Sequence, residues 1–360
     1  MSKPFSKDEL QIKGYYSSFI PGRPSAPILN SPISAKENIL RALSGQKPMW
    51  YPNVGMIGGD YKTFRPRMFP DNYIAHYIMD GEPPIDWSGI SLVQPSWFDT
   101  MWQFEPVAGG ALPVPGSNKI DDINDWETLT FPNLDDYDWE GCAKANAAYL
   151  DTDLPIEFGI PTGYWERLMA ILPVTEASIA LIDDSCQGAV HAFFEKLTDL
   201  YVDYLHRVKK YFNADIVLLH DDWGHQNSTF FSEETCREMI LPYFKRFVDT
   251  VHGLGMRFEH HCCGRAETLV PVMIDAGVDL WCPQPMNDTV ELARKYRGQG
   301  IVFGIECPPI APEMPDEMAY AAAKNLVDTY GDGPVAYLNY GGSMKMYEYV
   351  YELSRKVYEQ

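Results

Sequence analysis

Beyond residue 150 the chain alternates between short apolar runs and longer amphipathic stretches. Within one of the longer stretches, Val190, Phe193, Leu197 and Leu200 recur at the spacing of a helix face. Helices are predicted at 189–212, 232–253, 266–276, 289–297 and 316–330. Strands are predicted at the apolar runs 155–161, 214–220, 255–261, 278–283, 300–306 and 334–339.

Strands that alternate with helices predict parallel strands joined by right-handed crossovers. The apolar run 48–54 and one or two strands within 85–115 bring the expected number of strands to about eight. We therefore predict an α/β fold, a (β/α)8 TIM barrel. Residues 1–34, rich in Pro, Gly and Ser, are expected to form an N-terminal arm, and residues 35–360 a single barrel. The stretch 60–140, rich in Trp, Pro, Asp and Gly, predicts long loops over the barrel mouth.

The overall charge and the cysteines narrow the class of protein. The formal net charge of −21 at pH 7 argues against non-specific binding to nucleic acid. We expect neither a secretory leader nor a membrane span, because no apolar run approaches the roughly 18 residues that a span needs. The seven scattered cysteines do not resemble a disulfide framework. We therefore predict a cytoplasmic protein.

The run RFEHHCCG, at 257–264, places two histidines beside two cysteines. Because side chains alternate between the two faces of a strand, His261 and Cys263 share one face with Glu259, while His260 and Cys262 share the other. The first face is polar and is expected to point into the barrel near its mouth, where barrel enzymes keep their chemistry. Zinc binds imidazole nitrogen and thiolate sulfur. The alternative is that all four are buried residues of the core.

A second polar cluster follows the strand 214–220. His220 and Asp222 are candidates for acid–base chemistry or for orienting a metal ligand, and Asp221 for contacting the substrate. The alternative is a turn that leads into a helix, where Asp is common. A third cluster, Glu306 and Cys307, ends the strand 300–306, and their positions in the alternation allow only one of them to face the lumen.

Two tryptophans in the aromatic stretch SWFDTMWQF are candidates for substrate contact. Trp97 and Trp102 either line a pocket for a planar substrate or cover the barrel. The sequence leaves both interpretations open.

Four segments resemble the uroporphyrinogen decarboxylase superfamily of barrels: 34–53, 219–264, 276–288 and 300–306. The similarity includes the aspartate pair, the S-x-E helix start and the closing H-x-C-G, and it spans nearly the whole chain beyond residue 34. The decarboxylases proper carry an arginine-containing segment after the first strand. PMWYPNVGMIGGD has no arginine there, which argues against porphyrinogen decarboxylation.

The H-x-C-G element resembles the corrinoid-dependent methyltransferases of that superfamily, in which His and Cys bind zinc. The resemblance carries these roles to His261 and Cys263. Coenzyme M-dependent members have a further zinc cysteine near the last strand, where this chain has Tyr340. We predict Cys307 as the third ligand, because it preserves a His–Cys–Cys set, with Glu306 or Glu259 as alternatives.

The aromatic stretch SWFDTMWQFEPVAGG looks more like the members that demethylate methoxylated aromatics. The resemblance therefore implies a zinc-dependent methyltransferase that moves a methyl group from a small methylated substrate, preferably an aryl methyl ether, to the cobalt of a corrinoid protein. The alternatives are a decarboxylase-like lyase and a methyltransferase from a corrinoid protein to a thiol. A corrinoid protein is the expected partner, and a homodimer stays open.

Overall fold

The computed structural model describes residues 4–16, 27–55, 59–68, 78–83, 85–86, 89, 91–105, 110–308, 314–339 and 343–359. The chain divides into two compact units. Unit 1 comprises Met1–Thr63, Asp153–Glu157 and Val278–Gln360, and unit 2 comprises Phe64–Thr152 and Phe158–Gly277. Two strands, β3 (Lys62–Phe64) and β7 (Ile156–Ile160), contribute residues to both units.

Unit 2 holds most of the helices. Its other strands are β4 (Val93–Pro95), β5 (Met101–Glu105), β6 (Gly110–Pro113), β8 (Ile216–His220) and β9 (Arg257–His261). Its α-helices are α3 (Trp139–Ala145), α4 (Ala147–Leu150), α5 (Tyr164–Ile171), α6 (Val174–Ala180), α7 (Asp184–Phe212), α8 (Glu233–Met239), α9 (Leu241–Gly253) and α10 (Val270–Ala276). Short 3₁₀ helices are η2 (Trp97–Asp99), η3 (Ile123–Thr128), η4 (Leu134–Asp136) and η5 (Glu267–Leu269).

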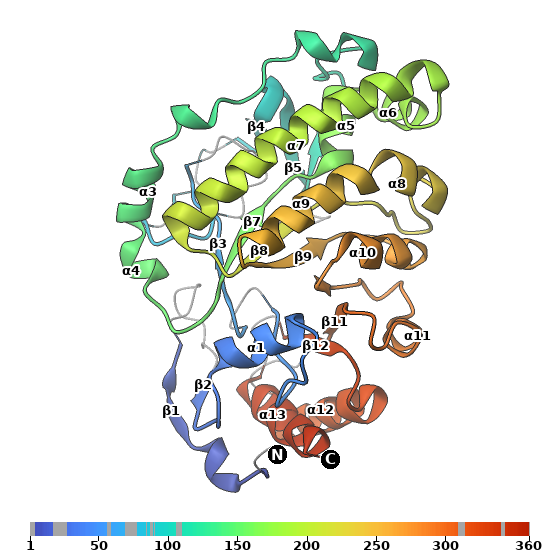
Figure 1. Cartoon of the computed structure of the whole chain (residues 1–360). Helices are drawn as coiled ribbons and strands as arrows, with labels where there is room; N and C mark the ends of the chain where they lie inside the picture. The colour runs from blue at the N-terminus through green and yellow to red at the C-terminus, as the bar shows by residue number, and fades with distance from the viewer. Residues whose placement is uncertain are drawn as a thin grey trace. The chain divides into compact units, whose positions relative to one another are not determined.

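The core of unit 2 lies between its parallel strands and the helices α7 and α9, which run side by side (Figure 1). Phe158 of β7 stacks on Phe212 of α7 with ring centroids 5.6 Å apart. Phe258 of β9 packs edge-on against Phe244 and Phe247 of α9, at 5.5 and 5.7 Å. The aromatic side chains therefore fix which face of each strand is turned toward the helices.

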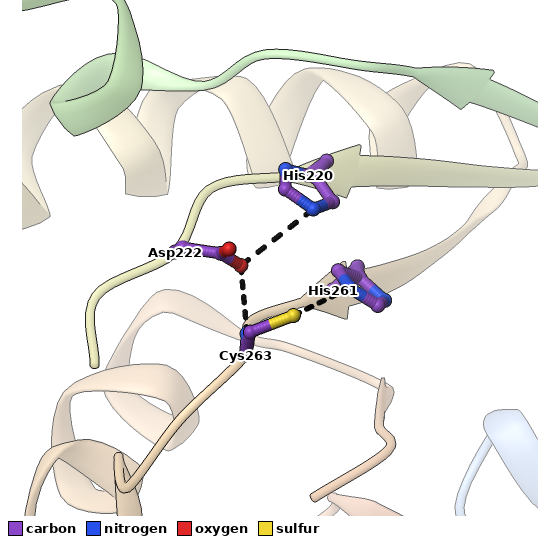
Figure 2. Close-up of side chains that lie close together, drawn as sticks. All are labelled: His220, Asp222, His261 and Cys263. Carbon is purple, nitrogen blue, oxygen red and sulfur yellow. Dashed lines mark hydrogen bonds and ion pairs between the residues drawn. The ribbon is translucent and has the colours of Figure 1, made fainter. Parts of the chain in front are cut away.

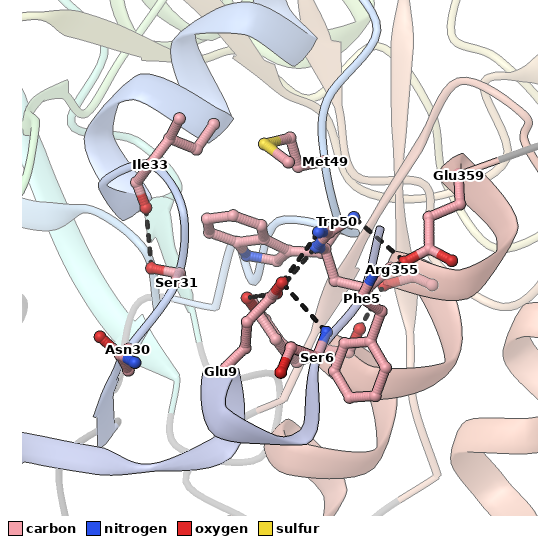
Figure 3. Close-up of polar contacts among 12 residues, drawn as sticks. Phe5, Ser6, Glu9, Asn30, Ser31, Ile33, Met49, Trp50, Arg355 and Glu359 are labelled. Carbon is pink, nitrogen blue, oxygen red and sulfur yellow. Dashed lines mark hydrogen bonds and ion pairs between the residues drawn. The ribbon is translucent and has the colours of Figure 1, made fainter. Parts of the chain in front are cut away.

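Unit 1 contains the N-terminal and the C-terminal parts of the chain. Its strands are β1 (Ile12–Tyr15), β2 (Pro27–Leu29), β10 (Leu280–Trp281), β11 (Val302–Glu306) and β12 (Val335–Leu338). Its helices are η1 (Lys7–Leu10), α1 (Ala35–Leu43), α11 (Thr289–Lys295), α12 (Asp316–Tyr330) and α13 (Met344–Tyr358). β11 pairs in parallel with both β10 and β12. Near the N-terminus, the buried carboxylate of Glu9 binds the guanidinium of Arg355 in α13 (Figure 3).

The structure confirms the predicted fold class, an α/β fold of the (β/α) barrel type, because parallel strands alternate with helices along the chain. Each strand predicted beyond residue 150 is present, as are the five predicted helices, with 232–253 divided into α8 and α9. The run 48–54 forms only an isolated parallel bridge, between Asn53 and Tyr337. The division into an arm and one barrel stays a prediction.

The prediction of barrel strands within 85–115 is wrong. That segment forms β4, β5 and β6, a separate antiparallel sheet in which consecutive strands pair with their neighbours. The additional strand of the seven-stranded sheet is β3, which lies beside β7. Among the described residues, no helix combines the length and the apolar character that crossing a bilayer requires.

Candidate metal centre

Four potential metal donors converge where β8 and β9 end (Figure 2). His220 is the last residue of β8 and pairs in parallel register with His261, the last residue of β9. Asp222 and Cys263 each follow two residues later. One ligand atom from each of the four side chains lies within 4.8 Å of the others. His220 is buried and the other three residues are partly exposed, so solvent reaches part of the cluster.

The two histidines and two cysteines of β9 separate as the strand alternation predicts. His261 Nε2 lies 3.3 Å from Cys263 Sγ. His260 instead packs its ring against Phe244 of α9 at 5.0 Å, and the buried Cys262 sulfur accepts a hydrogen bond from the Trp223 backbone N–H. This confirms the predicted split: His261 and Cys263 share one side of the strand, and His260 faces the helices.

The loops that follow the two strands touch through their backbones. Gly264 has φ +78°, and a Cβ atom there would lie 2.4 Å from the Gly224 carbonyl carbon. A Cβ atom on Gly224 would lie 2.7 Å from the carbonyl oxygen of Arg265. A side chain at either position would push the loops apart. The glycine of the H-x-C-G motif therefore allows the two donor-bearing loops to meet.

His220 is oriented by a residue that the sequence did not suggest. Its Nδ1 lies 2.9 Å from Oε2 of the buried Glu166, in α5. Its ring stacks on that of His261 with centroids 4.5 Å apart, and its Nε2 lies 3.6 Å from Asp222 Oδ1. A carboxylate that binds one ring nitrogen of a histidine fixes which nitrogen faces a metal. The sequence feature that could have pointed to Glu166 is a charged residue in an apolar segment that follows a predicted strand.

The cluster's electrostatics favour the forms of His and Asp that bind metals. Burial, with the nearby His220, lowers the pKa of His261 to about 3, so its imidazole is neutral at pH 7. Burial alone would raise the pKa of Asp222, but His220, His261 and the Cys263 N–H lower it overall. Burial raises the pKa of the Cys263 thiol, which must therefore lose a proton when a metal binds.

The pKa of Glu166 is raised, whereas the pKa of Asp222 is lowered. Burial raises the pKa of Glu166 to about 8, although the neighbouring His220 opposes the shift. At pH 7 its carboxyl group is therefore mostly protonated in the metal-free site. Proton exchange between Glu166 and His220 is thus available beside the cluster.

Asp221 has a structural position although the sequence suggested a substrate contact. Its carboxylate is buried and accepts the backbone N–H groups of Tyr164, Trp165 and Glu166 at 2.9–3.2 Å. It also accepts the indole N–H of Trp223 at 2.9 Å. These contacts cap the start of α5 and place Glu166. The assignment of Asp221 to substrate binding stays a prediction.

The two tryptophans that the sequence suggested as substrate contacts are both buried. Trp97 is buried against Tyr201 and the guanidinium of Arg167, and Trp102 is buried within β5. Their role as substrate contacts stays a prediction.

Glu259, the alternative ligand two residues before His261, is buried in β9 and is not among the four donors. Cys307 and Glu306 belong to unit 1, at the end of β11. Burial raises the Cys307 pKa to about 12. Tyr340 lies outside the described residues. Cys307 as third ligand stays a prediction.

The fold and the cluster define an α/β barrel with a candidate metal centre at the carboxyl ends of two parallel strands. Residues 184–341 match the family model described as uroporphyrinogen decarboxylase (URO-D). No curated protein matches the chain.

Two solved structures give a measure of the likeness in fold. A methyltransferase from Methanosarcina mazei has 13% sequence identity and a TM-score of 0.57, over 91% of this chain and 99% of that one. A B12-independent methionine synthase from Shewanella sp. W3-18-1, in complex with selenomethionine, has 12% identity and a TM-score of 0.40 over 69% and 70%. The likeness to the Methanosarcina structure supports the barrel fold.

Proposed function

We propose that this chain is a zinc-dependent methyltransferase that moves a methyl group from a small donor, an aryl methyl ether, to the cobalt of a corrinoid protein. The observation that carries the proposal is the convergence of two imidazoles, a thiol and a carboxylate where β8 and β9 end. The H-x-C-G motif and the family match over 184–341 support it. Function in barrel enzymes resides at this end of the strands.

The donor set fits zinc. Three protein ligands and one open position are usual for catalytic zinc, and nitrogen and sulfur donors suit this ion. His220, His261 and Cys263 would hold the ion, with the predicted Cys307 as the competing third ligand. Zinc supplies Lewis-acid stabilisation of the negative charge that develops on the ether oxygen when the methyl group leaves.

The side chains around these ligands orient them. Glu166 occupies Nδ1 of His220, which leaves Nε2 turned toward Asp222 and the cluster. Asp222 Oδ1 accepts the backbone N–H of Cys263 at 2.7 Å and so holds the thiol-bearing residue in place. Because the pKa of Asp222 is lowered, its carboxylate is ionised at neutral pH and serves to position rather than to donate a proton.

The reaction breaks the methyl–oxygen bond and forms a methyl–cobalt bond. The electron pair of reduced cobalt, on a partner docked at the site, forms the new bond, and the departing oxygen keeps the pair of the old one. The oxygen then takes a proton. In the protein, Glu166 and His220 form a buried pair that can hold this proton next to the cluster.

A donor screen tests the proposal. Purified zinc-loaded protein is mixed with a reduced corrinoid protein and a panel of methyl ethers, and methyl-cobalt formation is followed by absorbance. We expect methylation of cobalt with aryl methyl ethers and loss of activity in Cys263→Ser. Methylation of a thiol from methyl-cobalt without any ether activity would assign the opposite direction of transfer. Carbon dioxide release from a carboxylated substrate by metal-free protein would assign a lyase.

The affinity for zinc is expected to rise with pH. The Cys263 thiol, whose pKa is raised by burial, is protonated across pH 6–8 and must release its proton to bind zinc. His261 and Asp222, whose pKa values are lowered, have no proton to release in this range. The zinc association constant should therefore increase at least about tenfold per pH unit. Competition titration with a chelator at three pH values measures it, and a pH-independent constant would exclude thiolate ligation.

X-ray absorption at the zinc edge counts the sulfur ligands. We expect one sulfur neighbour at about 2.3 Å, because Cys263 is the only thiol among the four converging donors. Cys307→Ser should then give the same spectrum as the unchanged protein. Two sulfur neighbours, reduced to one in Cys307→Ser, would instead assign Cys307 as the third ligand.

A further inference from the structure

The buried Arg65, near the candidate metal centre, has no anionic partner among the residues that the structure describes. Arg65 directly follows β3, and its backbone exchanges two hydrogen bonds with Met79 at 2.9 and 3.0 Å. These bonds fix the backbone from which the side chain starts. The residue is only 4% exposed. The Arg65 side chain therefore has little contact with water.

The side chain lies across β7. A Cβ atom on Gly159 would lie 2.3 Å from Nε of Arg65 and 3.0 Å from its Cγ. Only glycine leaves room for the arginine at this point of the strand. The lack of a side chain at Gly159 therefore allows the Arg65 side chain to take this position.

Within the described residues, the Arg65 side chain makes no hydrogen bond or ion pair, and its buried Nε has no acceptor. Two other arginines, Arg355 and Arg67, have carboxylate partners. Arg355 is bound by Glu9, and Arg67, two residues after Arg65, is bound by Asp80 at 2.7 Å. Burying a guanidinium without an anion costs free energy. An anionic group on a bound ligand would offset this cost.

Arg65 is turned toward the same side of the strands as the metal donors. On β7, Phe158 packs against α7, so the adjacent Gly159 faces away from the helices. On β9, His260 packs against α9, so His261 also faces away from them. His261 lies within the electrostatic influence of the Arg65 guanidinium, which agrees with this placement.

We propose that Arg65 binds a carboxylate of the substrate, so that the methyl donors are small ethers that carry a carboxylate. This inference rests on the proposed function, because it places the donor at the metal centre. The planar guanidinium offers a pair of parallel N–H groups that matches a carboxylate. The bound anion satisfies the arginine and fixes the distance of the ether group from the cluster.

Calorimetric binding of two probes to the zinc-loaded protein tests the inference without the corrinoid partner. The probes are 3-methoxybenzoate and its uncharged counterpart 3-methoxybenzamide. We expect the acid to bind on the order of 100-fold more tightly than the amide. In Arg65→Met the preference should vanish, and in Arg65→Lys it should be partly retained. The control Arg67→Gln, whose partner is Asp80, should keep the full preference.

Two measurements separate a recognition role from damage to the fold. The melting temperature and zinc content of each variant show whether it is folded and loaded. Gly159→Ala is a second variant, which keeps the charge of Arg65 but displaces its guanidinium, and it should also weaken binding of the acid. Equal binding of acid and amide by the unchanged protein, or an undiminished preference in folded Arg65→Met, would overturn the inference.

The same experiment distinguishes the inference from the proposed function. Methyl transfer with equal efficiency from the acid and the amide would leave the function standing and remove the role of Arg65. An Arg65-dependent preference for the acid with no transfer to any corrinoid would leave the anion site standing and remove the proposed reaction.

Discussion

Cys263→Ser and His261→Gln are expected to lower the affinity for zinc by more than about 100-fold. Loss of an outer partner of a metal ligand typically costs 10–100-fold, and loss of a ligand itself should cost more. Cys263 and His261 contribute two of the four donors that lie within 4.8 Å of one another. Elemental analysis should find about one zinc per chain in unchanged protein prepared without chelators.

The neighbouring residues provide matched controls. Cys262→Ser and His260→Gln change the same residue types one position away, and they should leave zinc affinity nearly intact. Both are buried against other groups, Cys262 at the Trp223 N–H and His260 at Phe244, so these variants are expected to lose stability instead. Chelator competition and thermal melting measure the two effects separately. Zinc loss in the control pair, with retention in the first pair, would reverse the assignment of the strand faces.

Glu9→Ala is expected to reduce the free energy of unfolding by about 3–5 kcal/mol, because it removes the carboxylate that binds the buried guanidinium of Arg355. Arg355 has no exposed side-chain surface, and Nε and Nη2 bind the two carboxylate oxygens of Glu9 at 2.9 and 3.0 Å (Figure 3). Tyr351 donates a further hydrogen bond to Glu9 at 2.7 Å. Denaturant unfolding measures the loss.

Glu37→Ala is the matched control, since Glu37 pairs with Arg41 on the exposed side of α1. Surface ion pairs contribute at most about 1 kcal/mol, so this variant should unfold almost like the unchanged protein. The simultaneous change Glu9→Gln with Arg355→Met removes both charges and should recover part of the loss. Equal stability of the Glu9 and Glu37 variants would mean that the buried pair does not stabilise the fold.

The sequence predicted the parts of the fold that carry a regular pattern. The strands β8 and β9 and the helix α7 each show an apolar run or a helical spacing, and all were found. The helix α5 was missed because all its residues, Tyr164–Ile171, are buried, so no polar face marks its period. The antiparallel sheet at 93–113 was missed because its short strands show no clean alternation of burial.

Only part of the candidate cluster follows from local sequence geometry. Strand alternation was sufficient to choose His261 and Cys263 over their neighbours, because the choice depends on local geometry alone. The approach of His261 and Cys263 to His220 and Asp222 depends on the register of β8 on β9, which cannot be predicted from the sequence alone. Glu166 contacts the cluster from α5, and the charge of Arg65, after β3, acts on His261, so both depend on parts of the chain that are distant in sequence. Such contacts leave no periodic signal.

The backbone contact between the loops at Gly224 and Gly264 has a consequence for metal exchange. Peptide groups rather than flexible side chains set the separation of these loops, so their spacing is stiff. A stiff frame holds the donors near their bound positions before the ion arrives, and little ordering cost accompanies binding. Metal-free protein should therefore keep its native fold after chelation and reload rapidly, in contrast to small zinc domains that unfold when their ion is removed.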